Sequence, residues 1–380
     1  MRDTAEVVVI GGGVVGCAVA YNLAKLGLTD VVLVEKGYLA SGSTGRCGGG
    51  IRQQWSTPQN TVMAMASVRL FAGLEQELGY PTEYIQGGYL ILAYTEDEVA
   101  QYRKNVAMQQ GLGLDVRFLS PAEARDVVPC LNIESVLAAT YCPTDGKANP
   151  FLVTQGYALA AQRLGVEVCR RTTVTGIEVT DGRVQAVITD KGRIATHWVV
   201  NAAGGYAAAI AALAGLDIPV VPYRHEILVT EPIEPLFDPL IISFYYGTYI
   251  VQTPHGSILM GQGDPDEPPG YNMRSGLPFA RSITRKMVRL IPCLKEVKVV
   301  RQWAGLYAMT PDAQPILGPV EGLAGYVQAV GFSGHGFMVA PITGQLIAEH
   351  IVRGETSLPI AELSLSRFAT GEIRREASVV

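Results

Sequence analysis

The sequence predicts an α/β protein in which a parallel-sheet domain is interleaved with an antiparallel-sheet domain. Residues 7–10 are four consecutive β-branched residues, typical of a strand buried on both faces, and residues 14–24 continue with helical spacing. Residues 217–262 contain short runs of alternating polarity, which indicate antiparallel strands. A second glycine-rich strand-to-helix turn follows at residues 326–337.

The first strand-to-helix turn has the spacing of a dinucleotide-binding loop. Gly11, Gly13 and Gly16 fit G-x-G-x-x-G. In this motif the first glycine allows a tight turn, the second lets the backbone approach a pyrophosphate, and the third lets helix and strand pack closely. The N–H groups and positive dipole end of the new helix would then face the phosphates.

The second strand, residues 30–35, ends in Glu35, 19 residues after Gly16. The motif carries a carboxylate there for a ribose hydroxyl, so Glu35 favours an unphosphorylated adenosine ribose. The alternative is a tight strand-to-helix turn followed by an incidental surface glutamate.

Composition excludes several classes of function. The 380 residues allow two or three domain-sized units, and 48% of them are hydrophobic, which is ample for a large core. The net charge of −5 and the lack of a basic cluster argue against a nucleic-acid partner. The apolar stretch 7–28 contains Asn22, Lys25 and several glycines, so we expect no transmembrane segment. Without the basic start of a secretory signal, a cytoplasmic protein is expected.

The six cysteines show no C-x-x-C spacing and the five histidines form no cluster. We therefore predict no metal site, and buried thiols in a reducing compartment.

Residues 39–55 form a loop of glycines and hydroxyls that offers little for a core. In a dinucleotide-binding domain we expect such exposed backbone to face the cofactor. A disordered linker is the alternative.

The remaining pattern predicts further helices and strands. Thr57 is placed as the N-cap, and Pro58 in the first turn, of a helix that ends near Leu78. Other helices are expected at residues 96–110, 151–164, 277–290 and 338–352, with strands at 87–94, 172–200 and 226–260. The predicted first domain comprises residues 1–84, 146–216 and 300–380, and the second comprises residues 85–145 and 217–299.

Four further motifs occur in a recognisable order. They are the loop at 41–52, Asn-Ala-Ala-Gly at 201–204, Thr-Pro-Asp at 310–312 and Gly-Phe-Ser-Gly-His-Gly-Phe at 331–337. With these motifs the chain resembles the FAD-dependent amine oxidoreductases, the D-amino acid oxidase-like group that also holds glycine oxidase and sarcosine oxidase. Through residues 46–54 and 222–225 it is most similar to the β subunits of L-proline dehydrogenase and multimeric sarcosine oxidase.

The resemblance implies an FAD-binding Rossmann-type domain, like that of glutathione reductase, interleaved with an antiparallel-sheet substrate domain. FAD would lie extended across the first domain, with substrate between its flavin and the second domain's sheet. The turn at 331–337 would direct a helix N-terminus at the flavin. The matching cofactor-binding residues are Gly11, Gly13, Val14, Val15, Gly16, Glu35, Lys36, Ser41, Ser43, Thr44, Arg46, Cys47, Gly48, Gly50, Ile51, Val174, Ala202, Ala203, Gly204, Gly305, Gly331, Phe332, Ser333, Gly334, His335, Gly336 and Phe337.

The resemblance also implies catalytic residues. Arg52 matches the arginine that holds the substrate carboxylate in monomeric sarcosine oxidase, a task suited to a guanidinium. The lysine that shares this task in monomeric sarcosine oxidase corresponds to Met338, so one of the two carboxylate-binding side chains is absent. The carboxylate-binding arginine of glycine oxidase corresponds to Tyr307, which leaves a hydroxyl over the substrate.

His335, Tyr249 and His225 complete the candidate catalytic set. A capping or packing histidine is an equal alternative for His335, and ordinary strand residues are the alternative for Tyr249 and His225.

Three further positions differ from the sarcosine oxidases. The cysteine that binds FAD covalently in the monomeric enzyme corresponds to Gly305, so we expect non-covalent FAD. The histidine that tethers FMN in the multimeric enzyme corresponds to Pro150, so an FMN shared with a partner chain would also be untethered. The lysine that promotes reaction with oxygen in the monomeric enzyme corresponds to Leu259, which predicts a different electron acceptor.

The implied function is FAD-dependent oxidation of a small secondary amino acid, such as sarcosine, L-proline or a related imino acid. Hydride would pass from the α-carbon to flavin N5. The chain would act as the catalytic β-type subunit of a dehydrogenase with partner subunits. Two alternatives stay open: a stand-alone glycine or sarcosine-type oxidase that produces hydrogen peroxide, and an FAD dehydrogenase of a hydroxy acid.

Overall fold

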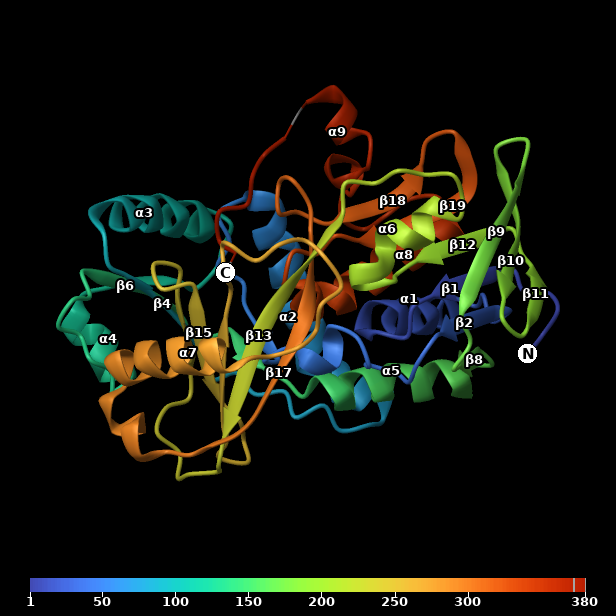
Figure 1. The fold of residues 1–380 in the computed structure, drawn as a ribbon. Coiled ribbons are helices and arrows are strands. Elements are labelled where there is room, and N and C mark those ends of the chain that lie inside the picture. The colour runs from blue at the N-terminus through green and yellow to red at the C-terminus, as the bar shows by residue number, and fades with distance from the viewer. Residues whose placement is uncertain (372, 380) are drawn as a thin grey trace.

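Two large β-sheets lie side by side in the computed structural model, which describes residues 1–371 and 373–379 (Figure 1). The nine-stranded sheet consists of β1 (Val7–Ile10), β2 (Val31–Glu35), β8 (Glu167–Arg170), β9 (Val174–Thr180), β10 (Arg183–Thr189), β11 (Gly192–Ala195), β12 (Trp198–Asn201), β18 (Ile316–Val320) and β19 (Leu323–Val330). Its main order is β11-β10-β19-β12-β1-β2-β8, with β9 paired to β10 and β18 to β19.

The second sheet has eight strands in the order β17-β13-β16-β15-β14-β4-β6-β5. These strands are β4 (Tyr89–Ala93), β5 (Arg117–Leu119), β6 (Ala138–Cys142), β13 (Val221–Thr230), β14 (Leu240–Ser243), β15 (Thr248–Gln252), β16 (Ile258–Gln262) and β17 (Val299–Met309). A small third sheet pairs β3 (Gly50–Ile51) with β7 (Gly146–Lys147).

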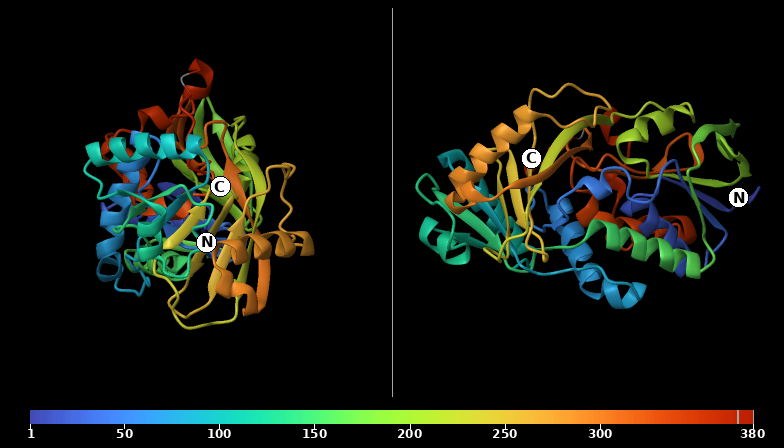
Figure 2. Two further views of the ribbon diagram at one scale, coloured as in Figure 1. Left: turned by 90° about the vertical axis from the view of Figure 1, so that its left-hand side faces the viewer. Right: turned by 60° about the horizontal axis from the view of Figure 1, so that its bottom comes forward.

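Helices cover both large sheets. They are α1 (Val14–Lys25), α2 (Pro58–Leu78), α3 (Glu96–Gly111), α4 (Pro121–Val127), α5 (Pro150–Arg163), α6 (Ala207–Ala212), α7 (Leu277–Leu290), α8 (Gly336–Arg353) and α9 (Arg367–Thr370), with 3-10 turns η1 (Thr44–Arg46), η2 (Gly204–Tyr206), η3 (Pro292–Glu296) and η4 (Ala361–Leu363). Figure 1 shows α3, α4 and α7 around the eight-stranded sheet and α1, α5, α6 and α8 around the nine-stranded one, an arrangement that Figure 2 shows from two other sides.

β1 occupies the centre of the nine-stranded sheet, and all four of its residues are buried. It pairs in parallel with β12 and β2, so that Val8 lies opposite Val199 and Val32. Val7 and Val9 pack into the core formed with α1, α2, α5 and α8, while Val8 packs on the other face. The glycine turn therefore leaves β1 at the carboxyl edge of the sheet, where such folds bind ligands.

The eight-stranded sheet is framed by its two longest strands, β13 and β17, which pair antiparallel from Val221 opposite Met309 to Thr230 opposite Val299. One face of this sheet packs on α7 and α4. The opposite face carries Tyr89, Leu240 and Tyr249 and packs on α3.

The predicted α/β fold class is confirmed, and most helices begin and end within two residues of their predicted positions. Asp181 and Gly182, with φ of 50° and 68°, form the turn between β9 and β10. Thr57 occupies the N-cap position of α2, but its side chain makes no capping hydrogen bond to that helix.

One assignment differs from the structure. The predicted boundaries put residues 300–309 in the first domain, whereas β17 belongs to the eight-stranded sheet because it pairs along its length with β13. The division into two domains itself stays a prediction. No helix within the described ranges is long and apolar enough to cross a membrane.

Candidate active site

A long cavity of about 340 Å³ lies at the carboxyl ends of β1, β2 and β12. Gly11, Gly13 and the first residues of α1 form one wall. Gly11 has a φ of 117°, and a Cβ there would lie 2.4 Å from the Ala202 carbonyl oxygen, so the position requires glycine. The N-cap of α1, Gly13, has no side chain to cap the helix, and the first N–H group, that of Val14, donates to Thr44 Oγ1 at 3.2 Å. The other N–H groups of the first turn remain open to an anion.

Glu35 lies at the end of β2, on the wall of this cavity. Its carboxylate accepts hydrogen bonds from the backbone N–H groups of Gly12, at 2.7 Å, and Gly37, at 2.6 Å. Two backbone donors thus fix the carboxylate at the wall of the cavity. The same wall contains Lys36, whose Nζ lies 3.0 Å from the centre of the Tyr206 ring.

The turn at residues 331–337 forms the end of the cavity where a second, smaller pocket begins. Gly334 has a φ of 95°, and a Cβ there would lie 2.4 Å from the Tyr307 ring. α8 begins directly afterwards, and its N-cap His335 makes no side-chain capping bond. Ser333, Gly334 and Phe337 line both spaces, so the open N-terminus of α8 lies where the two meet.

The smaller pocket has a volume of about 70 Å³. Since one water needs about 10–15 Å³ on this measure, the pocket has room for on the order of five water-sized groups, which suits a small molecule. The lining residues are Cys47, Gly48, Gly49, Gly50, Arg52, Trp55, Tyr89, Leu240, Ile242, Tyr249, Tyr307, Ser333, Gly334, His335, Phe337, Met338, Ser378 and Val379.

Arg52 brings a buried positive charge to the smaller pocket. Its guanidinium carbon lies 3.9 Å from the centre of the Trp55 ring, and its Nη1 and Nη2 donate to the carbonyl oxygens of Gln54 and Ser378 at 3.1 and 2.6 Å. Burial lowers its pKa from the ordinary value, but a guanidinium stays charged in proteins. Among the described residues, two of its five N–H groups have a hydrogen-bond partner, and the other three can serve a ligand.

Three rings stand in a buried stack beside Arg52. His225 lies parallel to Tyr307 at 4.1 Å between ring centres and to Tyr249 at 5.7 Å. The two tyrosines line the pocket, whereas His225, stacked between them, is not among its lining residues. Burial lowers the pKa of His225 to about 3 and raises the pKa of both tyrosines above the ordinary value.

His335 does line the pocket, and its ring contacts the Trp55 ring in a tilted arrangement, with 4.5 Å between ring centres. Its Nε2 is buried without a hydrogen-bond partner among the described residues. Burial is the main reason that its pKa falls to about 4, so the ring is neutral at pH 7. A neutral ring with one free nitrogen can accept or donate one hydrogen bond to a ligand.

Several predicted cofactor residues lie behind the cavity walls. Gly16 lets α1 approach β1, because a Cβ there would lie 1.9 Å from the Gly11 carbonyl oxygen. Arg46 donates to the carbonyl oxygens of Ser41 and Ala304, and a Cβ at Gly305 would lie 3.1 Å from the Arg46 Cβ. Behind the walls lie Gly16, Arg46, Ile51, Gly305 and Gly331, while the other predicted cofactor residues line one or both spaces.

Sequence reasoning missed several lining residues. Trp55, Tyr89, Leu240 and Ile242 are apolar or aromatic residues of loops and strands, with no motif to distinguish them from core residues. Ser378 and Val379 reach the pocket from a segment that is far from Arg52 in the sequence. Such neighbours become visible only when the chain is folded.

A cavity walled by a dinucleotide-binding glycine turn meets a small pocket with a buried guanidinium. This combination defines a class of protein, the oxidoreductases that bind a dinucleotide beside a small acid. The chain belongs to one family of that class: residues 6–350 match the FAD dependent oxidoreductase family. FAD is therefore its cofactor.

Relatives of this chain are similar along almost its whole length. Sarcosine oxidase subunit beta of Rhodobacter capsulatus is 31% identical, over 98% of this chain and 90% of the relative. The crystal structure of L-proline dehydrogenase from P. horikoshii is 41% identical with a TM-score of 0.94, covering 98% of this chain and all of that one. Glycine oxidase from Geobacillus kaustophilus is 27% identical with a TM-score of 0.88, covering 96% and 99%.

The residues present fit FAD. Gly11 makes the tight turn that a Cβ would block by clashing with the Ala202 carbonyl oxygen, and the N-terminus of α1 after this turn suits a pyrophosphate. Glu35 supplies a carboxylate of the kind that binds a ribose hydroxyl. The open N-terminus of α8 offers positive electrostatic potential at the junction with the smaller pocket.

Proposed function

We propose that the chain oxidises a small secondary amino acid, such as sarcosine, L-proline or a related imino acid. The observation that carries this proposal is the pocket of about 70 Å³, which combines the Arg52 guanidinium with aromatic and aliphatic walls. A guanidinium with three unused N–H groups suits a carboxylate. The apolar walls suit the hydrocarbon part of such an acid, and similarity to sarcosine oxidase and L-proline dehydrogenase supports the same substrate class.

The reaction needs position more than strong acid or base. FAD, when bound, supplies the two-electron acceptor for the hydride of the α-carbon. Arg52 binds the carboxylate and so fixes the α-carbon relative to the junction of the two spaces. Tyr249 and Tyr307 have raised pKa values, so their hydroxyls stay protonated at neutral pH and can hydrogen-bond to the substrate. His335 is neutral at pH 7 and adds no second positive charge beside the amine.

The proposal includes a setting for this activity. We infer that the chain works as the catalytic β-type subunit of a heteromeric dehydrogenase, because a relative similar over 98% of this chain is a β subunit. FAD is held without a covalent bond in this proposal, since Gly305 has no side chain to form one. An FMN shared with a partner would be untethered too, at Pro150 of α5. We further propose a cytoplasmic location, which the free cysteine thiols favour.

An anaerobic reduction panel tests the proposed function. Purified holoprotein is mixed with sarcosine, L-proline, D-proline, hydroxyproline, glycine, L-lactate and glycerol 3-phosphate, and flavin absorbance is followed. We expect bleaching by at least one secondary amino acid and none by the hydroxy acid or the polyol phosphate. Bleaching by L-lactate or glycerol 3-phosphate alone would replace the proposal with oxidation of an alcohol.

A further inference from the structure

We propose that Glu376 is a positioning residue of the smaller pocket. It anchors residues 376–379 on the N-terminus of α2, and this segment then orients Arg52 and forms the wall that limits the size of acid the pocket accepts. The inference rests on the proposed function for the identity of the acid, but its geometry concerns any small carboxylate.

The anchor is a buried carboxylate at the N-terminus of a 21-residue helix. Glu376 Oε1 accepts from Ser56 N, at 2.9 Å, from Ser56 Oγ and from Ser378 N, at 2.9 Å. Glu376 Oε2 accepts from Thr57 N, Thr57 Oγ1 and Asn60 Nδ2 at 3.2, 2.9 and 3.0 Å. Thr57 makes no capping bond of its own, so Glu376 supplies the negative charge that a helix N-terminus favours.

The charge of Glu376 is compensated within this site. Burial raises the pKa of Glu376, but the hydrogen bonds from Ser56, Asn60 and Ser378 outweigh burial and leave the pKa below its ordinary value. The carboxylate is therefore ionised at neutral pH. Its anchoring strength comes from charge-assisted hydrogen bonds, which are stronger than neutral ones.

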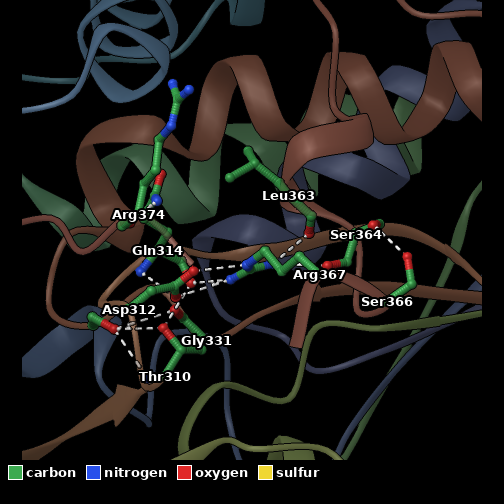
Figure 3. A network of polar contacts seen from close by, with 10 residues as sticks. Thr310, Asp312, Gln314, Gly331, Leu363, Ser364, Ser366, Arg367 and Arg374 are labelled. Carbon is green, nitrogen blue, oxygen red and sulfur yellow. Dashed lines mark hydrogen bonds and ion pairs between the residues drawn. The ribbon is translucent and has the colours of Figure 1, made fainter. Parts of the chain in front are cut away.

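A second set of contacts holds the chain that leads to Glu376 (Figure 3). Arg367 binds both carboxylate oxygens of Asp312, at 2.7 and 3.1 Å. The backbone N–H of Glu376 donates to the Asp312 carbonyl oxygen at 2.8 Å, and Gln314 Nε2 donates to the Arg374 carbonyl oxygen. The segment is thus fixed at both the Thr310–Gln314 turn and the start of α2.

From this anchor the segment reaches the pocket. The Ser378 carbonyl oxygen accepts from Arg52 Nη2 at 2.6 Å, and Ser378 and Val379 line the pocket. Together with the Trp55 ring and the Gln54 carbonyl, this contact fixes the plane of the guanidinium. Its remaining N–H groups are thereby held in one orientation for a carboxylate, in the pocket that Val379 helps to line.

Loss of the anchor has two separable consequences. Arg52 would lose a fixed partner, which weakens binding of every carboxylate. The wall formed by Ser378 and Val379 would also retreat, which benefits larger acids only. Discrimination between a small and a large carboxylate is therefore the readout that a merely structural role for Glu376 would leave unchanged.

The test compares two planar carboxylates that differ by one ring, pyrrole-2-carboxylate and indole-2-carboxylate. Their dissociation constants are measured from the change in flavin absorbance of the holoprotein, for the wild type, Glu376→Gln and Val379→Ala. Glu362→Gln, an exposed glutamate of η4, is the matched control. Flavin content and melting temperature are recorded for each variant.

For Glu376→Gln we expect the dissociation constant of pyrrole-2-carboxylate to rise about ten-fold, as for loss of one charged hydrogen-bond partner. The preference for the smaller probe should fall by a similar factor. Val379→Ala, which leaves the anchor intact, should lower the preference alone, and Glu362→Gln should change neither. Val379→Ala keeps the test valid even when Glu376→Gln folds poorly.

Two results overturn the inference. An unchanged preference in both variants means that the segment does not limit size. Tighter binding of both probes to Glu376→Gln means that the segment competes with the ligand instead of positioning Arg52. Because probe binding needs no turnover, these results are independent of the amino-acid panel: a shifted preference without amino-acid oxidation refutes only the proposed function.

Discussion

At the scale of single residues, Arg52 connects the Trp55 ring, the Ser378 carbonyl and the smaller pocket. We predict that Arg52→Ala raises KM for an amino acid by about ten- to a few hundred-fold, because losing a charged hydrogen-bond partner costs on the order of 1.5–3 kcal/mol. Flavin content should stay near that of the wild type, since Arg52 does not line the longer cavity.

Steady-state kinetics with absorbance-based flavin quantification check this prediction. Arg52→Lys keeps the charge but loses the planar fork, so it should recover only part of the binding. Unaltered kinetics in Arg52→Ala would place the carboxylate site elsewhere.

His225 predicts a dependence of stability on pH. Burial lowers its pKa from 6.5 to about 3. The unfolded chain therefore binds more protons in this window, and stability falls as the pH drops from about 6.5 toward 3. At pH 5 the penalty is about 2 kcal/mol, from 1.5 pH units at about 1.4 kcal/mol each. His225→Phe, which can keep the stack between Tyr249 and Tyr307, should lose less melting temperature between pH 7.5 and pH 5 than the wild type.

Thermal melts at the two pH values measure this difference. The exposed His197 provides the control, because His197→Phe removes a histidine without removing a buried one. An equal loss of melting temperature in the wild type and in His225→Phe would show that another group governs the decrease in stability at low pH.

At the scale of elements, the backbone of the turn before α8 packs closely against the Tyr307 side chain. Gly334 and Gly354 have positive φ angles of 95° and 79°, before and after the same helix. A Cβ at Gly354 meets nothing within 4 Å, whereas at Gly334 it would lie 2.4 Å from the Tyr307 ring. We predict that Gly354→Ala lowers stability by about 1 kcal/mol with normal kinetics, while Gly334→Ala also displaces Tyr307 and lowers kcat/KM at least ten-fold.

Denaturant unfolding and steady-state kinetics of both variants separate the effect of backbone strain from the effect of the contact with the Tyr307 ring. If Gly334→Ala matched Gly354→Ala in both measurements, the close packing of Tyr307 on the turn would have no functional weight.

Local signals predicted much of the fold and part of the site. Three features of the longer cavity depend only on neighbours within a few residues, and each lines its wall. They are the glycine turn after β1, the acid that ends β2 and the turn before α8. Contacts between distant segments could not be predicted in this way. Asn60 lies 316 residues before its partner Glu376, and neither residue belongs to a recognisable pattern. The position of His225 between two tyrosines likewise depends on the register of four strands, β13, β15, β16 and β17.

At the scale of the whole molecule, the distribution of charge predicts the electron acceptor. Among the described residues that line the smaller pocket, Arg52 is the one with a positively charged side chain of the lysine or arginine type. In the proposed function, this charge binds the substrate carboxylate. Leu259, at the position of an oxygen-promoting lysine, pairs with Val251 inside an apolar cluster. A fixed positive charge near the reacting atoms favours reduction of oxygen, so we predict slow reoxidation by air and faster reoxidation by a dye or a quinone.

Stopped-flow mixing of substrate-reduced holoprotein with air-saturated buffer measures the rate directly. Leu259→Lys is the matching gain-of-charge variant and should react faster with oxygen. Reoxidation of the wild type as fast as turnover would favour an oxidase that produces hydrogen peroxide.

The order of strands has a consequence for how the protein is made. β1 is among the first residues to leave the ribosome, yet its neighbour β12 comes at residue 198 and β19 follows only at residue 323. At synthesis rates of about 5–20 residues per second, the apolar faces and unpaired edges of β1 and β2 wait on the order of 15–60 seconds for the complete sheet. The nascent chain cannot close its cofactor site during this interval. Because residues as late as Phe337 line the cavity, binding of FAD is a late event that follows synthesis of most of the chain.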